Sequence, residues 1–249
     1  MPLSTQLQHG QLVYFAKGDN DLSVYENKYF RWMAFGDVVQ SVIRKQKPHQ
    51  LTLPHQWAMT MPLLTLTPKN IIEFGLGAGN HLLFTQHLTP KMQHKVIEAN
   101  RNVLEAAVQY FPLKNYQECL IHGDANTWLE STNALQDDWF IFDIYHKTKF
   151  ADNSYNNLLE KVIERLPTFS VLTINFPETT EKEIKFWLLK LIAKQSHIAE
   201  FYSVPHYKNH VIHLIPKVPS KNIKMTSALA QRKQKYWRCF QRQFGLKVG

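Results

Sequence analysis

The residues best suited to chemistry lie where the apolar segment Ile71-Ile72 ends in Glu73-Phe74 and glycines follow at every second position, as Gly75, Gly77 and Gly79. Glycine permits a tight turn at a strand end and lets a ligand approach the backbone closely. Twenty-five residues after Glu73, the apolar pair Val96-Ile97 ends in Glu98, whose carboxylate can accept both hydroxyls of a ribose. The glycine turn and Glu98 together predict a nucleoside-binding site.

The glycine spacing narrows the class of nucleoside. The dinucleotide pattern G-x-G-x-x-G is not met, and no Gly-Lys-Ser/Thr of a phosphate-binding loop follows. An acid before alternating glycines is typical of folds that bind S-adenosylmethionine (AdoMet). We therefore expect Glu73 and the three glycines to bind AdoMet or its decarboxylated form.

Two further acids follow predicted strands. Asp124, with Ala125 beside it, comes after the short strand at Ile121 and is suited to the adenine amino group. Asp143 ends a fourth strand, Trp139 to Phe142. Polar groups at the carboxyl ends of parallel strands form the crevice where open α/β sheets bind ligands.

The candidate catalytic residues are Asp143, Tyr145 and His146. An imidazole with an unperturbed pKa near 6.5 suits a general base. His210 and His213 are three positions apart on a predicted strand, where they would point to opposite faces. The sequence therefore predicts no metal site.

Each candidate also has a purely structural interpretation. The glycines can serve tight strand-to-helix packing, and Glu98 can be an acid at a helix N-terminus. Asp124 can cap the helix that follows it, and Asp143 can pair with Lys147. His146 can be a surface histidine and Tyr145 a packing ring.

The elements that must position these residues alternate between strand and helix. Four strand-like segments, within 11–15, 22–26, 30–35 and 38–43, predict a small antiparallel unit. An apolar helix is expected from Gln56 to Leu66. Strands and helices then alternate to about Pro216 and end in an antiparallel pair, 198–204 and 210–215, which favours a doubly wound α/β sheet.

Composition supports one large domain with small additions. The chain has 249 residues and 44% hydrophobic content, enough for a full core. We expect an N-terminal β-hairpin domain at 1–53, a catalytic domain at 54–216 and a basic helical tail at 217–249. No apolar run reaches ~18 residues, so no membrane span is expected. Two cysteines and no signal pattern favour the cytoplasm.

The positive charge is confined to the end of the chain. Residues 201–249 hold ten of the 29 Lys and Arg residues and none of the 20 acids. Between Ser227 and Phe244, aromatic residues recur at helical spacing among basic ones, a pattern that can dock on nucleic acid or an acidic membrane. The alternative, which we favour, is that the aromatic stripe packs on the sheet domain or on a second subunit.

Together, these features resemble the spermidine synthase (polyamine aminopropyltransferase) family over roughly residues 10–216. The residues that carry the resemblance are the N-terminal hairpins with Gly36-Asp37-Val38-Val39-Gln40, the glycine turn, Gly123-Asp124-Ala125 and Asp143. The resemblance implies a small β domain on an AdoMet-methyltransferase-like sheet and a homodimer. It also implies that Gln40 faces the sulfonium side chain, Glu98 holds the ribose, Asp124 and Ala125 hold the adenine, and Asp143 borders the cofactor amine.

The chain departs from the family pattern where acids are usual. Ala78 replaces an acid in the glycine turn, His146 replaces the second acid after the fourth strand, and Gln56 replaces a glutamate before the lead-in helix. Asp143-Ile144-Tyr145 and the strand-end Asn175 are similar to a divergent bacterial branch. A site for a cationic diamine needs carboxylates, so we expect an acceptor other than a simple diamine.

Three functions stay open at this point. The first is a transferase that uses AdoMet or its decarboxylated form on an unknown acceptor. The second is a genuine aminopropyltransferase that uses Asp143. The third is a non-catalytic relative that binds nucleic acid or a protein partner through the basic tail.

Overall fold

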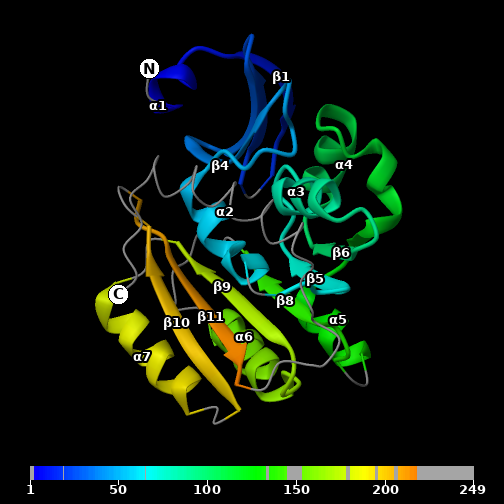
Figure 1. Cartoon of the computed structure of the whole chain (residues 1–249). Helices are drawn as coiled ribbons and strands as arrows, with labels where there is room; N and C mark the ends of the chain where they lie inside the picture. Colours follow the sequence, from blue (N-terminus) through cyan, green and yellow to red (C-terminus); the bar gives the residue numbers. More distant parts are fainter. Residues whose placement is uncertain are drawn as a thin grey trace.

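The computed structural model describes residues 3–18, 20–64, 66–132, 135–144, 153–177, 180–193, 196–204 and 207–217. These residues form two separate β-sheets, with the smaller sheet at the N-terminal end of the chain (Figure 1). The mixed α/β architecture confirms the predicted fold class.

The smaller sheet is a four-stranded antiparallel meander. Its strands pair in chain order and are β1 (Gln11–Ala16), β2 (Leu22–Glu26), β3 (Phe30–Phe35) and β4 (Val38–Arg44). Val24, Met33 and Ile43 point from this sheet into a core shared with the larger sheet's helices. All four strands were expected from their strand-like composition and the turns between them.

The larger sheet has seven strands in the order β10-β11-β9-β8-β5-β6-β7. Five of them are parallel: β5 (Asn70–Phe74), β6 (Gln93–Glu98), β7 (Leu120–His122), β8 (Trp139–Phe142) and β9 (Val171–Phe176). β11 (His210–Pro216) is antiparallel to both β9 and β10 (His197–Ser203), so the expected terminal antiparallel pair is confirmed. Because the order changes direction at β5, the carboxyl end of β5 lies where a doubly wound sheet opens a crevice.

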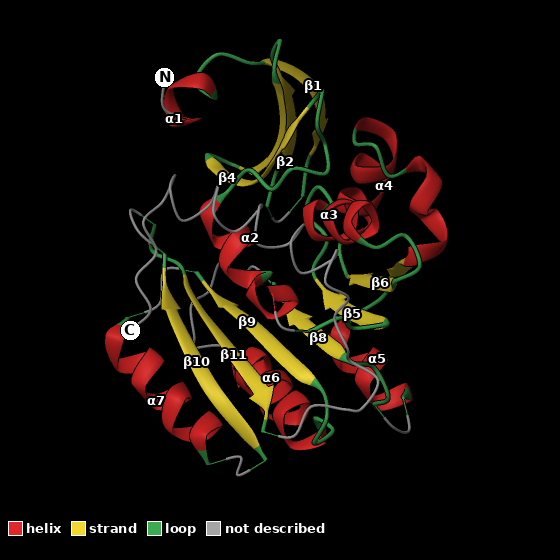
Figure 2. Cartoon of the chain, in the orientation of Figure 1, coloured by secondary structure: helices red, strands yellow, loops and turns green. Residues whose placement is uncertain are grey.

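Helices cover both faces of the larger sheet (Figure 2). One face packs against α5 (Ala125–Ser131), α6 (Asn153–Arg165) and α7 (Glu181–Ile192). The other face packs against α2 (Pro54–Met59) and α3 (Asn80–Leu88). α4 (Arg101–Tyr110) lies between this second face and the smaller sheet.

Strand alternation decides which side chains of β5 reach each layer. Ile72 and Phe74 belong to the core beneath α5, α6 and α7, whereas Ile71 belongs to the core beneath α2 and α3. Since successive side chains point to opposite faces, Glu73 shares the face of Ile71. The acid before the glycines is therefore buried beside α3, with 4% of its surface exposed.

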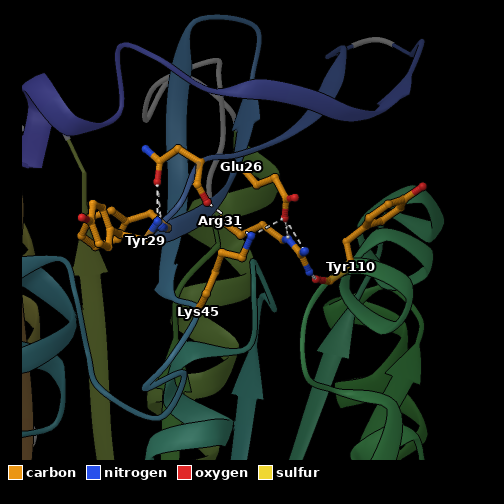
Figure 3. A network of polar contacts seen from close by, with 7 residues as sticks. Glu26, Tyr29, Arg31, Lys45 and Tyr110 are labelled. Carbon is orange, nitrogen blue, oxygen red and sulfur yellow. Dashed lines mark hydrogen bonds and ion pairs between the residues drawn. The ribbon is translucent and has the colours of Figure 1, made fainter.

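The two sheets are connected by polar contacts as well as by a shared core. Arg31 of β3 hydrogen-bonds to the backbone carbonyl of Tyr110, the last residue of α4, and pairs with Glu26 (Figure 3). Lys45 also contacts Glu26, at 3.2 Å. A cation at a helix C-terminus is favourable because the free carbonyls there carry partial negative charge. This contact fixes α4 relative to the smaller sheet.

Three local predictions were wrong or incomplete. The helix expected from Gln56 to Leu66 is instead α2 followed by a 3-10 turn, η1 (Met61–Leu64), because Pro62 cannot continue the helical hydrogen bonds. The N-terminal region was expected to be wholly extended, but Leu3–Gln6 forms the short helix α1. A 3-10 segment, η2 (Lys114–Cys119), was not predicted.

Among the described residues, no helix combines the length and the apolar character needed to cross a membrane.

Candidate functional site

A pocket of about 870 Å³ lies between the smaller sheet and the carboxyl ends of the parallel strands. Eight of the predicted site residues line it: Gln40, Glu73, Gly75, Gly77, Glu98, Asp124, Ala125 and Asp143. They come from both sheets and from five different segments of the chain. The fold therefore brings together residues that the sequence places up to 103 positions apart.

The glycine turn has positive φ angles, which residues with a side chain rarely adopt. Gly75 has φ +97° and Gly77 has φ +51°. A Cβ on Gly75 would lie 2.2 Å from the backbone oxygen of Asp143, and one on Gly77 would lie 2.9 Å from Ser41 Oγ. Both glycines are thus required by neighbouring protein atoms, and both also border the pocket.

Gly79 has a different position from the other two. It is the N-cap of α3 with φ +71°, and a Cβ there would meet the side chain of Leu113 at 2.6 Å. It is not among the residues that line the pocket. The packing interpretation of the glycines accounts for Gly79 directly.

Glu98 is held rigidly at the end of β6. Its two carboxylate oxygens accept hydrogen bonds from the backbone N–H groups of Leu76, at 2.9 Å, and Asn100, at 2.8 Å. Burial raises the pKa of Glu98, and the Asn100 and Leu76 N–H groups oppose that shift. Each carboxylate oxygen can accept more than one hydrogen bond, so Glu98 keeps acceptor capacity toward the pocket.

Asp124 caps a helix, as its structural interpretation anticipated. Its Oδ1 accepts a hydrogen bond from the Thr127 N–H at 3.0 Å, which makes Asp124 the N-cap of α5. Asp124 and Ala125 nevertheless line the pocket beside Gly123. Capping and ligand contact are compatible, because a carboxylate has a second oxygen.

The smaller sheet supplies the side of the pocket opposite the strand ends. Val38, Val39, Gln40 and Ser41 of β4 line it. Ser41 Oγ accepts a hydrogen bond from the Ala78 N–H at 2.8 Å, and Asn80 Nδ2 donates to the Val42 carbonyl at 2.9 Å. These two bonds attach the glycine turn to β4.

Glu73 lies between two histidines that were not predicted as site residues. His81 Nδ1 lies 2.6 Å from Glu73 Oε1, and His94 Nε2 lies 2.8 Å from Glu73 Oε2. All three side chains are buried. His81 faces Glu73 because it lies in the first turn of α3, directly after the glycine turn. This relationship could be found only by placing the turn in three dimensions.

Electrostatics indicate an ion pair between Glu73 and His81. Burial alone would raise the pKa of Glu73, but His81 and then His94 lower it below its ordinary value. Burial alone would lower the pKa of His81, but Glu73, Asp143 and the Gln56 backbone carbonyl raise it. The negative charge of Glu73 is thus compensated locally rather than presented to the pocket.

Asp143 is positioned by an amide from the neighbouring strand. Asn175 Nδ2 donates to Asp143 Oδ1 at 2.8 Å, and Asn209 Nδ2 donates to Asn175 Oδ1 at 3.1 Å. His55 lines the same part of the pocket. Burial, together with His81, lowers the pKa of His55 to about 4 even though Asp143 opposes the shift. His55 is therefore a neutral imidazole at pH 7.

Other sequence predictions lie outside the described residues. Tyr145, His146 and Lys147 belong to this group, and so does the basic tail beyond residue 217. His213 is described, and its side chain is fully buried. Its Nδ1 lies 2.8 Å from Thr173 Oγ1 and its Nε2 lies 3.0 Å from the Ala58 carbonyl. Both ring nitrogens therefore form hydrogen bonds inside the core.

Comparisons with known proteins identify related folds but no family. No family model matches the sequence, and no curated protein matches it. Human methyltransferase-like protein 13, solved in complex with SAH, superposes with a TM-score of 0.54 at 19% identity, covering 77% of this chain and 93% of that one.

Two spermidine synthase structures also match. One, in complex with the transition-state analogue AdoDATO, gives a TM-score of 0.60 at 15% identity and covers 86% of this chain and 77% of the other. The Thermotoga maritima enzyme gives 0.59 at 14% identity, covering 86% and 76%. At these identities the likeness shows the fold: a Rossmann-like, methyltransferase-type sheet that carries a small N-terminal β-sheet.

Proposed function

We propose that this protein is a transferase that binds AdoMet or decarboxylated AdoMet in the pocket between the two sheets. The observation that carries the proposal is the carboxylate of Glu98, fixed by two backbone N–H groups beside the glycine turn. A carboxylate fixed in this way is suited to accept both hydroxyls of a ribose, as in other nucleoside sites at the end of a second strand.

The other pocket residues would contact different parts of such a ligand. Asp124, Ala125 and Gln40 all line the pocket, and in our proposal the first two would contact the adenine and Gln40 the sulfonium chain. Asp143 borders the end at which transfer would occur. A pocket of about 870 Å³ has the size of sites that enclose a drug-sized ligand, so a nucleoside and part of an acceptor both fit the volume.

The chemistry at the transfer end disfavours a simple diamine as the acceptor. Glu73 is compensated by His81 and His94, and the surrounding side chains include His55, Gln56 and Asn175. Near an interior effective dielectric of about 20, a carboxylate 4 Å from an ammonium contributes roughly 4 kcal/mol of attraction before solvation is counted. Asp143 forms no ion pair with a described residue, and its Oδ1 accepts a hydrogen bond from the neutral amide of Asn175.

Most of the rate enhancement would come from orientation. A sulfonium is already a good leaving group, so the protein has to hold the acceptor in line with the electrophilic carbon. The contacts that fix the glycine turn, Glu98 and Asp143 serve that purpose. Tyr145 and His146 stay predicted catalytic residues.

Isothermal titration with AdoMet, decarboxylated AdoMet and methylthioadenosine tests the proposal. We expect at least one to bind below about a millimolar, and Glu98→Gln to weaken binding roughly tenfold, the loss of one charge-assisted hydrogen bond. Asp124→Asn should keep the helix cap, because Asn caps as well as Asp, while weakening binding severalfold. Glu105→Gln, at an exposed position on α4, is the matched control and should bind normally.

Failure of all three ligands to bind would contradict the proposal. Thermal unfolding of each variant without ligand separates a binding defect from a folding defect.

A second candidate is a true aminopropyltransferase, favoured by the orientation of Asp143 by Asn175. Incubation with decarboxylated AdoMet and putrescine should then give spermidine, and Asp143→Asn should abolish the product. Absence of product with active nucleoside binding would favour the first proposal.

A further inference from the structure

Three side chains that can ligate a metal converge at the transfer end of the pocket. Glu73 of β5, His81 of α3 and Asp143 after β8 each offer a donor atom, and these atoms lie within 4.8 Å of one another. All three residues line the pocket. They are separated by 8 and 62 positions in the sequence, so no local spacing reveals the group.

Outer hydrogen bonds orient the two carboxylates. His94 Nε2 contacts Glu73 Oε2 at 2.8 Å, and Asn175 Nδ2 donates to Asp143 Oδ1 at 2.8 Å. Each of these contacts uses one oxygen of the carboxylate. The other oxygen of Glu73, Oε1, faces His81. Metal ligands are commonly fixed by such outer partners, which set their orientation.

A further imidazole in the same pocket has a nitrogen without a hydrogen-bond partner among the described residues. His55 Nδ1 is buried and unpaired among the described residues. His55 lines the same pocket as Asp143 and His81. Buried polar groups are nearly always hydrogen-bonded, so an unpaired imidazole nitrogen in this pocket indicates a missing partner.

We propose that Glu73, His81 and Asp143 bind a first-row divalent transition metal such as Zn²⁺, with the unpaired imidazole of His55 in the same pocket. Imidazole and carboxylate together suit Zn²⁺ and its neighbours, whereas Mg²⁺ and Ca²⁺ prefer oxygen ligands alone. Zinc ligands lie about 2.0–2.2 Å from the ion, so two donors are at most about 4.4 Å apart. The donor atoms of the cluster lie within 4.8 Å of one another, and His81 Nδ1 is 2.6 Å from Glu73 Oε1, so small side-chain shifts would bring all three to an ion.

Charge balance is compatible with a neighbouring sulfonium. Two carboxylates and one divalent ion sum to zero when both imidazoles are neutral, so the occupied site would not repel a cationic cofactor. The ion would take the place of the proton that now joins Glu73 and His81. The alternative is that Glu73 and His81 share a proton as an ion pair and the cluster binds no metal.

On the proposed transferase function, the metal would define the class of acceptor. An ion with open positions toward the pocket binds an oxygen donor, such as a hydroxyl or carboxylate, and lowers the pKa of a bound hydroxyl. An ammonium group has no lone pair and cannot bind it. This agrees with an acceptor other than a simple diamine.

Metal titration of the untagged, chelator-treated full chain tests the site without any substrate. We expect Zn²⁺ to bind once per chain with a dissociation constant of about 10 µM or tighter. Co²⁺ should give the visible absorption of a site with fewer than six ligands, and Mg²⁺ should not compete at millimolar concentration. Asp143→Asn and His81→Gln should each weaken Zn²⁺ binding at least tenfold, while His9→Gln, at an exposed histidine, should not.

Two outcomes would overturn the proposal. One is the absence of saturable Zn²⁺ binding to the wild-type chain, which would mean that Glu73 and His81 form only an ion pair. The other is binding that persists in both variants. Asp143 is only partly buried, so Asp143→Asn carries the test if His81→Gln does not fold. Methylthioadenosine binding, measured without metal, reports on the nucleoside site separately.

Discussion

The hydroxyl of Ser41 accepts a hydrogen bond from the backbone N–H of Ala78 at 2.8 Å, and this bond joins β4 of the smaller sheet to the glycine turn of the larger one. Both residues are buried. The turn that borders the pocket is therefore positioned by a separate sheet as well as by its own strand. The smaller sheet is part of the site rather than an appendage.

Removing that hydroxyl should destabilise the protein. Ser41→Ala leaves the buried Ala78 N–H without a partner, which costs about 1–3 kcal/mol. Urea unfolding followed by circular dichroism measures the loss. Ser131→Ala, which removes an exposed hydroxyl bonded to the Trp128 carbonyl, should change stability by less than about 0.5 kcal/mol. Equal stabilities of the two variants would contradict the assigned role of Ser41.

Gly75 and Gly123 should respond very differently to alanine. Gly75→Ala combines φ +97° with a Cβ 2.2 Å from the Asp143 carbonyl oxygen, so we expect a loss of at least about 3 kcal/mol or no folded protein. A Cβ on Gly123 meets nothing within 4 Å, so Gly123→Ala should stay within about 0.5 kcal/mol of wild type. Thermal unfolding compares them, and a stable Gly75→Ala protein would show that the turn adopts another conformation.

Arg31 should not be replaceable by lysine. Its guanidinium bonds both to Glu26 and to the Tyr110 carbonyl, whereas an ammonium is a single point charge and cannot reproduce the fork. We expect Arg31→Lys to lose about 1 kcal/mol in urea unfolding. Arg101→Lys, in an exposed pair with Glu105 on α4, should lose less than about 0.5 kcal/mol. A loss no larger than this control would mean that the contact with α4 contributes little.

His213 should make stability depend on pH. Burial lowers its pKa to about 3, against about 6.5 in the unfolded chain. Between these values the unfolded state binds a proton that the folded state does not, so stability falls as the pH drops below about 6.5. The ring of Tyr202, 5.3 Å away, is neutral throughout this window, and burial raises its pKa further above it.

The contribution of His213 is isolated by comparison with His213→Gln. The variant should be less stable at pH 7.5, because Thr173 Oγ1 and the Ala58 carbonyl lose well-placed partners. Its deficit should shrink by about 1 kcal/mol at pH 5.5, since one pKa unit corresponds to about 1.4 kcal/mol. Urea unfolding at both pH values measures the difference. A constant deficit would show that His213 is not the neutral buried base assigned to it.

Much of the fold followed from the sequence because local patterns and core packing agree. Strand-like composition and turn residues predicted all four strands of the smaller sheet, and short apolar runs ending in acids predicted β5, β6 and β8. Local patterns failed where one residue overrides them. Pro62 divides the expected lead-in helix, and no periodicity signalled the 3-10 segment at Lys114–Cys119.

The sequence by itself determined that Glu98, Asp124 and Asp143 stand at strand ends, because strand length and the acid that follows are both local properties. It could not determine that Glu73 pairs with His81 and His94, since that depends on which face of β5 meets α3. Only the tertiary structure placed His55, His81 and Asp143 together, because the strand order β9-β8-β5 and the packing of α2 over it bring distant segments to one point.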